Sequence, residues 1–192
     1  MQELKDRIVK EGKVLPGNII KVDGFLNHRI DTELMDHIAE EFGKHFNMDE
    51  VTVILTAEAS GIALSAIVAQ HFHKPMIFAK KAKSDNIEGG LYQSDIFSYT
   101  YKKKVTLLVS KEWLRSDDKV LVIDDFMANG EAMRGLCDIV TAAGATLVGI
   151  GCAVEKGFQG GGDRLRAAGV NLKSLAIIDS AEPGNIVFRD DV

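Results

Sequence analysis

Residues Val120 to Ala132 read VLVIDDFMANGEA, four branched apolar residues followed by two adjacent carboxylates and a loop that reaches Gly130. The pattern predicts a buried strand that ends at Asp124 and Asp125, and a helix that begins just beyond the glycine. In an open α/β sheet, ligands bind beyond the carboxyl ends of the strands, where a helix N-terminus offers unpaired N–H groups to a phosphate. The stretch therefore predicts an anion-binding loop beside an acidic pair.

Apolar runs on both sides of this stretch alternate with helical patterns. Strands are predicted at residues 51–55, 76–79, 105–109, 119–123, 146–154 and 174–178, with helices after Gly61, through Ala143 and near 163–168. Nearly continuous apolar strands are typical of a parallel sheet that is covered on both faces. At 192 residues the chain is long enough for one full core. The predicted fold class is α/β, a single domain over residues 1–192.

The N-terminal third differs from this alternation. A helix is predicted over residues 3–11, a short extended piece over 19–22, and a second helix capped by Asp31. Further along, Ser84 to Lys104 is the only long stretch without clear periodicity, and such a segment is usually a functional flap or a disordered loop. The glycines of GFQGGGD, from Gly157 to Asp163, lack the spacing of known phosphate-binding fingerprints, so a flexible connection is predicted there.

The composition limits the classes of partner. With 46% hydrophobic residues, 27% charged residues and a net charge of -5, the chain is typical of a soluble globular protein with no overall attraction for nucleic acid or anionic lipid. The N-terminus lacks the apolar core of a signal peptide, and no run approaches membrane-spanning length. A cytoplasmic protein with no nucleic-acid or membrane partner is predicted.

The acidic pair suggests a particular ligand. Aspartates repel a phosphate that they face, but they accept hydrogen bonds from vicinal hydroxyls or bind a metal, which together with the loop favours a ribose 5-phosphate. A plain helix cap after a buried strand is the simpler alternative, although this run is longer than a cap needs. A phosphoacceptor receiver domain also has an acidic pair, but one that starts near Lys119 leaves too little chain for its repeated units.

The stretch from Val120 to Gly130 resembles the phosphoribosyl-diphosphate signature of type I phosphoribosyltransferases. It has four apolar residues, two acids, four variable residues and a glycine. The resemblance implies that fold, with Asp124 and Asp125 at the ribose hydroxyls. It also implies that the 5-phosphate is wrapped by Ala128, Asn129, Gly130, Glu131 and Ala132. Hypoxanthine and guanine enzymes usually have an aspartate at the position of Ala128, whereas adenine and xanthine enzymes resemble this chain in having alanine.

Four further segments, VDGFLNHRID, TAEASGIA, FAKKAKS and AVEKGFQ, are similar in sequence and order to bacterial xanthine phosphoribosyltransferases. The resemblance implies a hood, mainly residues 1–35, over the base, and contacts to xanthine from Ile20, Asn27 and Lys156. Asn27 offers a donor and an acceptor, and the Lys156 ammonium donates to an exocyclic oxygen but never to an amino group. Phe158 is a candidate to stack on the base. Taken singly, each also has an ordinary interpretation: a turn for Asn27, a solvated lysine for Lys156 and a core aromatic for Phe158.

The same resemblance assigns the remaining parts of the site. The pyrophosphate loop is expected at Glu58, Ala59, Ser60 and Gly61, with Lys80 and Lys81 as supporting cations. Magnesium is expected to arrive on the diphosphate substrate, with no metal site of the protein's own. A homodimer is expected, with the lysine loop reaching the partner's pyrophosphate. A mobile flap is expected at about 84–104, with Ser98 and Tyr99 as its Ser-aromatic pair.

The implied reaction joins xanthine to 5-phosphoribosyl 1-diphosphate and gives xanthosine 5-phosphate and pyrophosphate. Two alternatives remain open from the sequence. One is an adenine phosphoribosyltransferase. The other is a regulator that senses the diphosphate substrate without catalysis, although the chain offers no room for an added DNA-binding domain.

Overall fold

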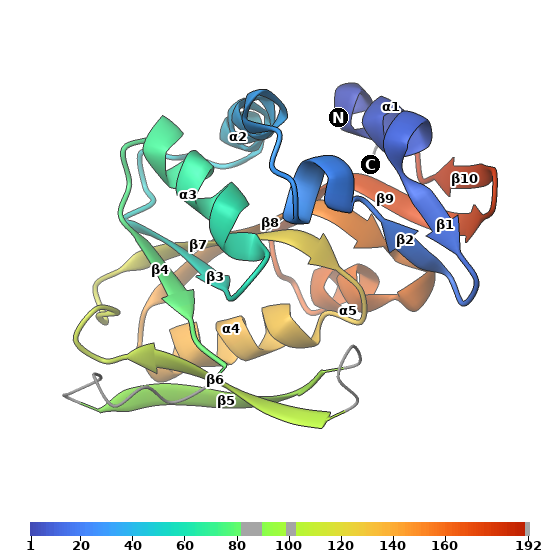
Figure 1. The fold of residues 1–192 in the computed structure, drawn as a ribbon. Helices are drawn as coiled ribbons and strands as arrows, with labels where there is room; N and C mark the ends of the chain where they lie inside the picture. The colour runs from blue at the N-terminus through green and yellow to red at the C-terminus, as the bar shows by residue number, and fades with distance from the viewer. Residues whose placement is uncertain (82–89, 99–102, 191–192) are drawn as a thin grey trace.

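The computed structural model describes residues 1–81, 90–98 and 103–190. Its central sheet has the strand order β10-β9-β8-β7-β3-β4 (Figure 1). The strands are β3 (Val53–Ala57), β4 (Met76–Ala79), β7 (Lys119–Met127), β8 (Thr146–Lys156), β9 (Leu172–Glu182) and β10 (Asn185–Phe188). Neighbours pair in parallel except for β10, which is antiparallel to β9. The predicted, mostly parallel sheet is confirmed, and β10 is an addition to the predicted strands.

Helices cover both faces of this sheet (Figure 1). One face carries α1 (Gln2–Glu11), α2 (Thr32–His45) and α3 (Gly61–His71), and the other carries α4 (Glu131–Ala142) and α5 (Gly161–Ala167). Along β7, Leu121 and Ile123 belong to the core beneath α2 and α3, while Val120 and Val122 belong to the core beneath α4. The apolar run of β7 is continuous because both of its faces are buried.

A two-stranded ribbon lies against α4, where an irregular flap was predicted. β5 (Leu91–Ser98) pairs antiparallel with β6 (Lys103–Ser110), so the expectation of irregular structure was wrong for 91–98 and 103–104. The strand predicted at 105–109 exists, but it belongs to this ribbon and not to the parallel sheet. Ile96 and Leu107 pack on Gly135 of α4, since a Cβ there would lie 2.5 Å and 3.0 Å from their side chains. Residues 84–89 and 99–102, Tyr99 included, lie outside the described residues.

The N-terminal segments cover the end of the sheet. A hairpin, β1 (Lys13–Leu15) with β2 (Ile19–Lys21), leads into a π-helical turn, η1 (Asp23–Asn27). Phe25 and Leu26 are buried, and this anchors the turn to the core under α2. Asp31 caps α2 as predicted, because its side chain accepts a hydrogen bond from the Leu34 N–H at 3.2 Å.

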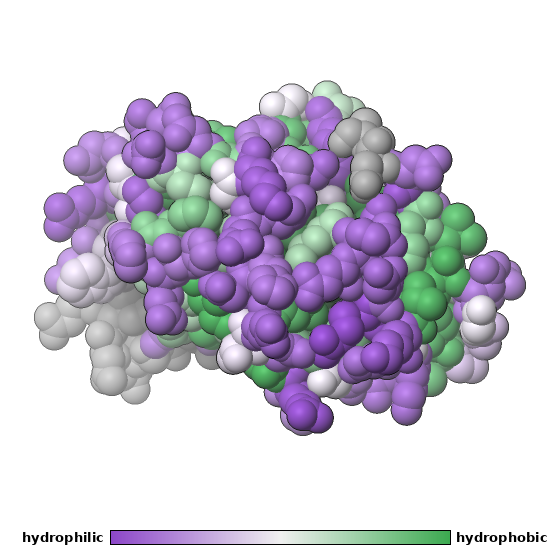
Figure 2. Space-filling model, turned by 90° about the horizontal axis from the view of Figure 1, so that it is seen from above, coloured by the Kyte–Doolittle hydropathy of each residue, from purple (hydrophilic) through white to green (hydrophobic). Residues whose placement is uncertain are grey.

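The surface over α1, α2, α3 and η1 is mostly hydrophilic, and a hydrophobic area lies at the end of the molecule that carries β1 (Figure 2). No helix within the described ranges is long and apolar enough to cross a membrane. The cytoplasmic location stays a prediction.

Candidate active site

Four neighbouring strands of the sheet, β8, β7, β3 and β4, end at the same edge. The predicted site residues follow those ends: Lys156 closes β8, the acidic pair lies near the end of β7, residues 58–61 follow β3, and Lys80 and Lys81 follow β4. This convergence follows from topology, because the carboxyl ends of parallel strands meet at one edge. Sequence positions about a hundred residues apart therefore share one site.

The acidic pair is buried, with Asp124 7% exposed and Asp125 1% exposed. The Asp125 N–H donates to Asp124 Oδ1 at 3.0 Å. Burial, and after it the charge of Asp125, raises the pKa of Asp124 well above its ordinary value, while the charge of Lys81 acts in the opposite direction. Two adjacent carboxylates in a dry position are costly for the fold alone, so the pair points to a ligand with hydroxyl donors or positive charge.

Both carboxylate oxygens of Asp125 accept hydrogen bonds from other predicted site residues. Ser60 Oγ donates to Oδ1 at 2.8 Å, and Asn27 Nδ2 donates to Oδ2 at 3.0 Å. A carboxylate only accepts, so the amide nitrogen of Asn27 faces Asp125 and the amide oxygen is left for another partner. The predicted base-binding, ribose-binding and pyrophosphate-binding segments thus meet at one side chain.

The segment between β3 and α3 packs tightly on the acidic pair. A Cβ at Gly61 would lie 2.3 Å from Asp124 Oδ1 and 2.3 Å from Thr56 Oγ1, so the backbone approaches that carboxylate as closely as only glycine allows. The Glu58–Ala59 peptide is cis. Glu58 Oε1 accepts a hydrogen bond from the Lys81 N–H at 2.5 Å, and this ties the segment to the lysines after β4.

The loop from Ala128 to Ala132 leads directly into α4. Gly130 precedes the helix with φ of 77°, a left-handed conformation that favours glycine. The Glu131 carboxylate turns toward the ribbon, where its Oε2 accepts from Arg134 Nη2 and from the Phe97 N–H. Gly130 has no side chain, so the N-cap residue does not occupy the backbone N–H groups at the start of α4. Such N–H groups can bind an anion.

The GFQGGGD segment is not a flexible connection, contrary to the prediction. It forms a 3-10 turn, η2 (Gly157–Gln159), and the start of α5, and it packs on the loop before α4. A Cβ at Gly161 would lie 2.4 Å from the Ala128 carbonyl oxygen and 2.7 Å from Gly130 N. The glycines are needed because two backbones touch there.

Lys156 lies between the sheet and the hairpin of β1 and β2. Its Nζ donates to the Asn18 carbonyl at 2.9 Å and lies 5.5 Å and 6.0 Å from the ring centroids of Phe126 and Phe158. Burial lowers the pKa of Lys156. Phe158 is 36% exposed and is therefore not a core aromatic, whereas Ile20, two residues beyond Asn18, is 8% exposed and packs in the core.

Three residues beside the site carry no clear sequence signal. Thr56 Oγ1 is buried and makes no hydrogen bond within the described residues. Phe126 and Asn18 contact Lys156, but an aromatic after a strand and an asparagine in a turn are each ordinary in sequence. Across the part of the chain that the structure describes, no three His, Cys, Asp or Glu side chains are grouped so as to hold a metal ion.

Comparisons with known proteins agree with this geometry. The family model of the phosphoribosyl transferase domain matches residues 25–170. A solved structure described as APRTase from Giardia lamblia complexed with 9-deazaadenine has a TM-score of 0.76 at 22% identity, over 91% of this chain and 96% of that one, and this shows a shared fold.

Sequence likeness is stronger. A xanthine phosphoribosyltransferase from Lachnoclostridium phytofermentans is 53% identical over 100% of both chains. Another from Bifidobacterium adolescentis is 51% identical over 98% of this chain and 100% of its own. With such likeness along its whole length, the chain belongs to the xanthine phosphoribosyltransferase family of phosphoribosyl transferases.

Proposed function

We propose that the protein transfers 5-phosphoribose from 5-phosphoribosyl 1-diphosphate to xanthine, giving xanthosine 5-phosphate and pyrophosphate in purine salvage. The observation that carries this proposal is the Asp125 carboxylate, which joins Ser60 of the pyrophosphate segment to Asn27 of the base segment. A substrate whose ribose lies at Asp125 would have its diphosphate on one side and the incoming base on the other. The departing diphosphate and the incoming base would then lie on opposite sides of the ribose C1.

The residues act mainly by positioning. Asp124 and Asp125 would accept from the ribose hydroxyls, and the backbone of 128–132 would bind the 5-phosphate. In the reaction, the C1–O bond to the diphosphate breaks, a ring nitrogen of xanthine forms the C1–N bond, and the proton of that nitrogen passes to solvent. Residues 58–61 and the cations Lys80 and Lys81 would stabilise the departing pyrophosphate.

Magnesium would fit the site through its oxygen donors. Burial, and after it the charge of Asp125, raises the pKa of Asp124, and a cation nearby would favour its ionised form. Asp124 and Asp125 offer carboxylate oxygens, the ligand type that magnesium prefers, to an ion that the diphosphate itself would carry. Carried on the diphosphate, magnesium would neutralise charge on the leaving group. The protein's own contribution is the fixed position of those carboxylates.

The choice of xanthine rests on two polar groups. Because the Asn27 nitrogen is directed to Asp125, its oxygen is the atom available to a base, and an oxygen accepts from a protonated ring nitrogen. Lys156 Nζ, held by the Asn18 carbonyl and beside Phe158, would donate to an exocyclic oxygen. Adenine presents an amino group in place of an oxygen, so it would offer the lysine no acceptor at that position. The likeness to adenine enzymes, at 22% identity, concerns the fold alone.

Lys156→Ala is expected to reduce kcat/KM for xanthine by about a hundredfold while changing that for adenine much less, because a site loses discrimination when a donor that pairs with one base is removed. The assay uses both bases with 5-phosphoribosyl 1-diphosphate and magnesium. Lys44→Ala, which removes an exposed lysine from α2, is the matched control and should leave both values unchanged. Equal losses for the two bases would show that Lys156 does not read the base.

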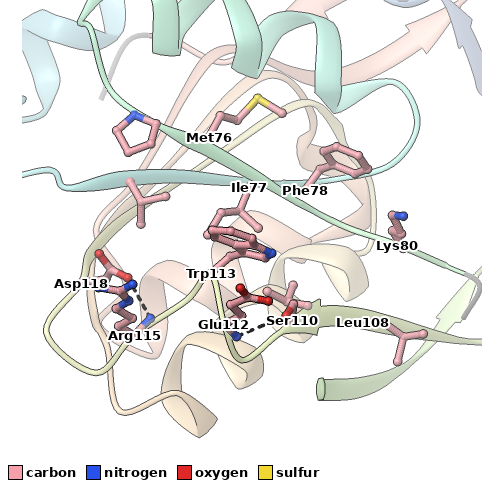
Figure 3. A pocket seen from close by; sticks show the side chains of 13 residues that line it. Met76, Ile77, Phe78, Lys80, Leu108, Ser110, Glu112, Trp113, Arg115 and Asp118 are labelled. Carbon is pink, nitrogen blue, oxygen red and sulfur yellow. Dashed lines mark hydrogen bonds between the residues drawn. The ribbon is translucent and has the colours of Figure 1, made fainter. Parts of the chain in front are cut away.

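We also propose a homodimer formed at the open edge of β4. A groove of about 560 Å³ runs along β4 and residues 108–118, with Lys80 at one end (Figure 3). Phe78 and Trp113 line it and are 38% and 63% exposed, and aromatic side chains are enriched in protein interfaces. β4 is the edge strand of the sheet, and among the described residues its outer side is bridged at Lys80, to Leu108. The rest of such an edge can pair with another chain. The groove reaches Lys80, the residue next to Lys81, and this supports a shared active site.

Complementation tests the shared site. A Lys81→Ala chain and an Asp125→Asn chain, each with reduced activity alone, are mixed under conditions where subunits exchange. If the lysine acts across the interface, mixed dimers regain an intact site and activity returns. Within one chain, the Lys81 backbone N–H already donates to Glu58, and the Lys81 charge opposes the rise in the pKa of Asp124. The competing outcome is therefore a site complete in each chain. Proven exchange with no recovery, or an active monomer in sedimentation, would establish that competing outcome.

A further inference from the structure

Arg164, on α5, is bonded to the loop before α4. Its Nη2 donates to the Asn129 carbonyl at 3.0 Å, and its Nη1 donates to the Gln159 carbonyl at 3.4 Å. One planar guanidinium therefore spans two segments, the loop from Ala128 to Ala132 and the η2 turn that carries Phe158. A charge-assisted hydrogen bond of this kind is stronger than a neutral one.

The contact constrains the direction of a backbone N–H. In a trans peptide the carbonyl of Asn129 and the N–H of Gly130 point in opposite directions within one plane. When Arg164 holds the carbonyl from the α5 side, the N–H is directed away from α5. Gly161 supports the same peptide from behind, because its missing Cβ would lie 2.6 Å from the Asn129 carbonyl carbon. Together the two residues fix the plane of the peptide.

α5 is itself firmly attached to the sheet, so it can hold the neighbouring loop in a fixed position. Arg166 donates to both oxygens of Glu155, at 3.1 Å and 2.7 Å, and Glu155 is fully buried on β8. Ser174 of β9 also donates to Glu155. Arg189 donates to Asp163 at 2.6 Å and so joins the helix start to the C-terminal segment. Because α5 is held to the sheet in this way, the contact between Arg164 and Asn129 fixes the loop at 128–132 relative to the sheet.

We propose that Arg164 is a positioning residue for the 5-phosphate of the substrate. It acts through the Asn129–Gly130 peptide, whose N–H it directs toward the phosphate, and it ties that loop to the segment beside the base. The inference rests on the proposed function only in taking residues 128–132 as the phosphate loop. Arg164 itself need not touch the substrate.

The test measures binding of two ligands that occupy different parts of the site. Ribose 5-phosphate probes the loop at 128–132, and pyrophosphate with magnesium probes the segment at 58–61. Calorimetric titration of Arg164→Ala is expected to show about tenfold weaker binding of ribose 5-phosphate and unchanged binding of pyrophosphate. In kinetics, KM for 5-phosphoribosyl 1-diphosphate should rise about tenfold with kcat changed about twofold or less.

Two further variants separate positioning from a general loss of structure. Arg164→Lys keeps the charge but cannot bond both carbonyls with a planar group, so its affinity for ribose 5-phosphate should fall between the wild type and Arg164→Ala. Lys44→Ala, which removes an exposed cation on α2 outside the proposed site, should bind as the wild type does. A structural role alone would weaken both ligands together and lower the melting temperature, and that outcome overturns the proposal.

The two proposals fail in different ways. If the wild type does not bind ribose 5-phosphate at all, the assignment of the phosphate loop is wrong. If the wild type binds it and both Arg164 variants bind it equally well, the loop assignment stands and the positioning role of Arg164 is wrong.

Discussion

Asp125→Asn is expected to lower turnover by roughly ten- to a thousandfold, as for the loss of one preorganised polar group at a reacting centre. The asparagine would present an amide nitrogen in place of one carboxylate oxygen, opposite a donor from either Ser60 or Asn27. A ribose hydroxyl would then meet a rearranged site. Asp124→Asn should lower turnover by a similar factor, because an amide oxygen is a weaker acceptor than a carboxylate oxygen. Steady-state kinetics with both substrates varied would measure the change.

Stability measurements on Asp124→Asn provide the control, because loss of the fold would also abolish activity. Burial raises the pKa of Asp124 in the folded protein, so between about pH 4, the ordinary value for the unfolded chain, and the raised value the folded state binds more protons. The wild type therefore loses stability as the pH rises through that window, and the asparagine variant does not. Its melting temperature should exceed that of the wild type at neutral pH, and the difference should vanish below about pH 4. Unchanged turnover in both variants would contradict the ribose assignment.

The strand that carries the acidic pair was predictable because its signals are local. Val120 to Ile123 are apolar at every position, which only a strand covered on both faces requires, and Gly130 marks the turn into α4. The convergence of Lys156, the acidic pair and residues 58–61 also follows from local signals, because parallel strands with helical connections bring their carboxyl ends to one edge.

The ribbon was missed because its pattern is short and depends on a distant partner. Ser94 and Ile96 face α4 while Asp95 and Phe97 face outward, an alternation of a few residues beside glycines. Such an alternation becomes a strand only when a partner such as β6 and a surface such as Gly135 are available. Tertiary context therefore decides the structure there.

The role of α5 could not be predicted for a related reason. Glycines in sequence indicate a flexible loop or a close approach with equal force, and only the position of the neighbouring backbone distinguishes them. Gly161 proves to be a point of contact with the loop at Ala128. The contact of Arg164 with Asn129 joins segments 35 residues apart, and no spacing rule predicts it.

A single methyl group added at Gly61 should disturb the acidic pair directly. As the first residue of α3 it would gain helix propensity from alanine, about 1 kcal/mol at most. The added Cβ, however, would lie 2.3 Å from Asp124 Oδ1 and 2.3 Å from Thr56 Oγ1, both on buried side chains with little room to move. Overpacking of a buried site costs about 1–3 kcal/mol, so the steric cost should exceed the gain in propensity.

Gly61→Ala is therefore expected to lower turnover by about a hundredfold, because displacing a catalytic group by about an ångström costs roughly that factor. The carboxylate of Asp124 and the segment at Ser60 would have to separate, and both the ribose and the pyrophosphate contacts would suffer. Gly24→Ala is the matched control, since a Cβ there meets nothing within 4 Å and activity should be kept. Kinetics should show the loss mainly in kcat, with ribose 5-phosphate and pyrophosphate each binding less tightly. Wild-type turnover in Gly61→Ala would mean that the acidic pair and the segment before α3 move apart freely, and the tight contact between them would then have no part in catalysis.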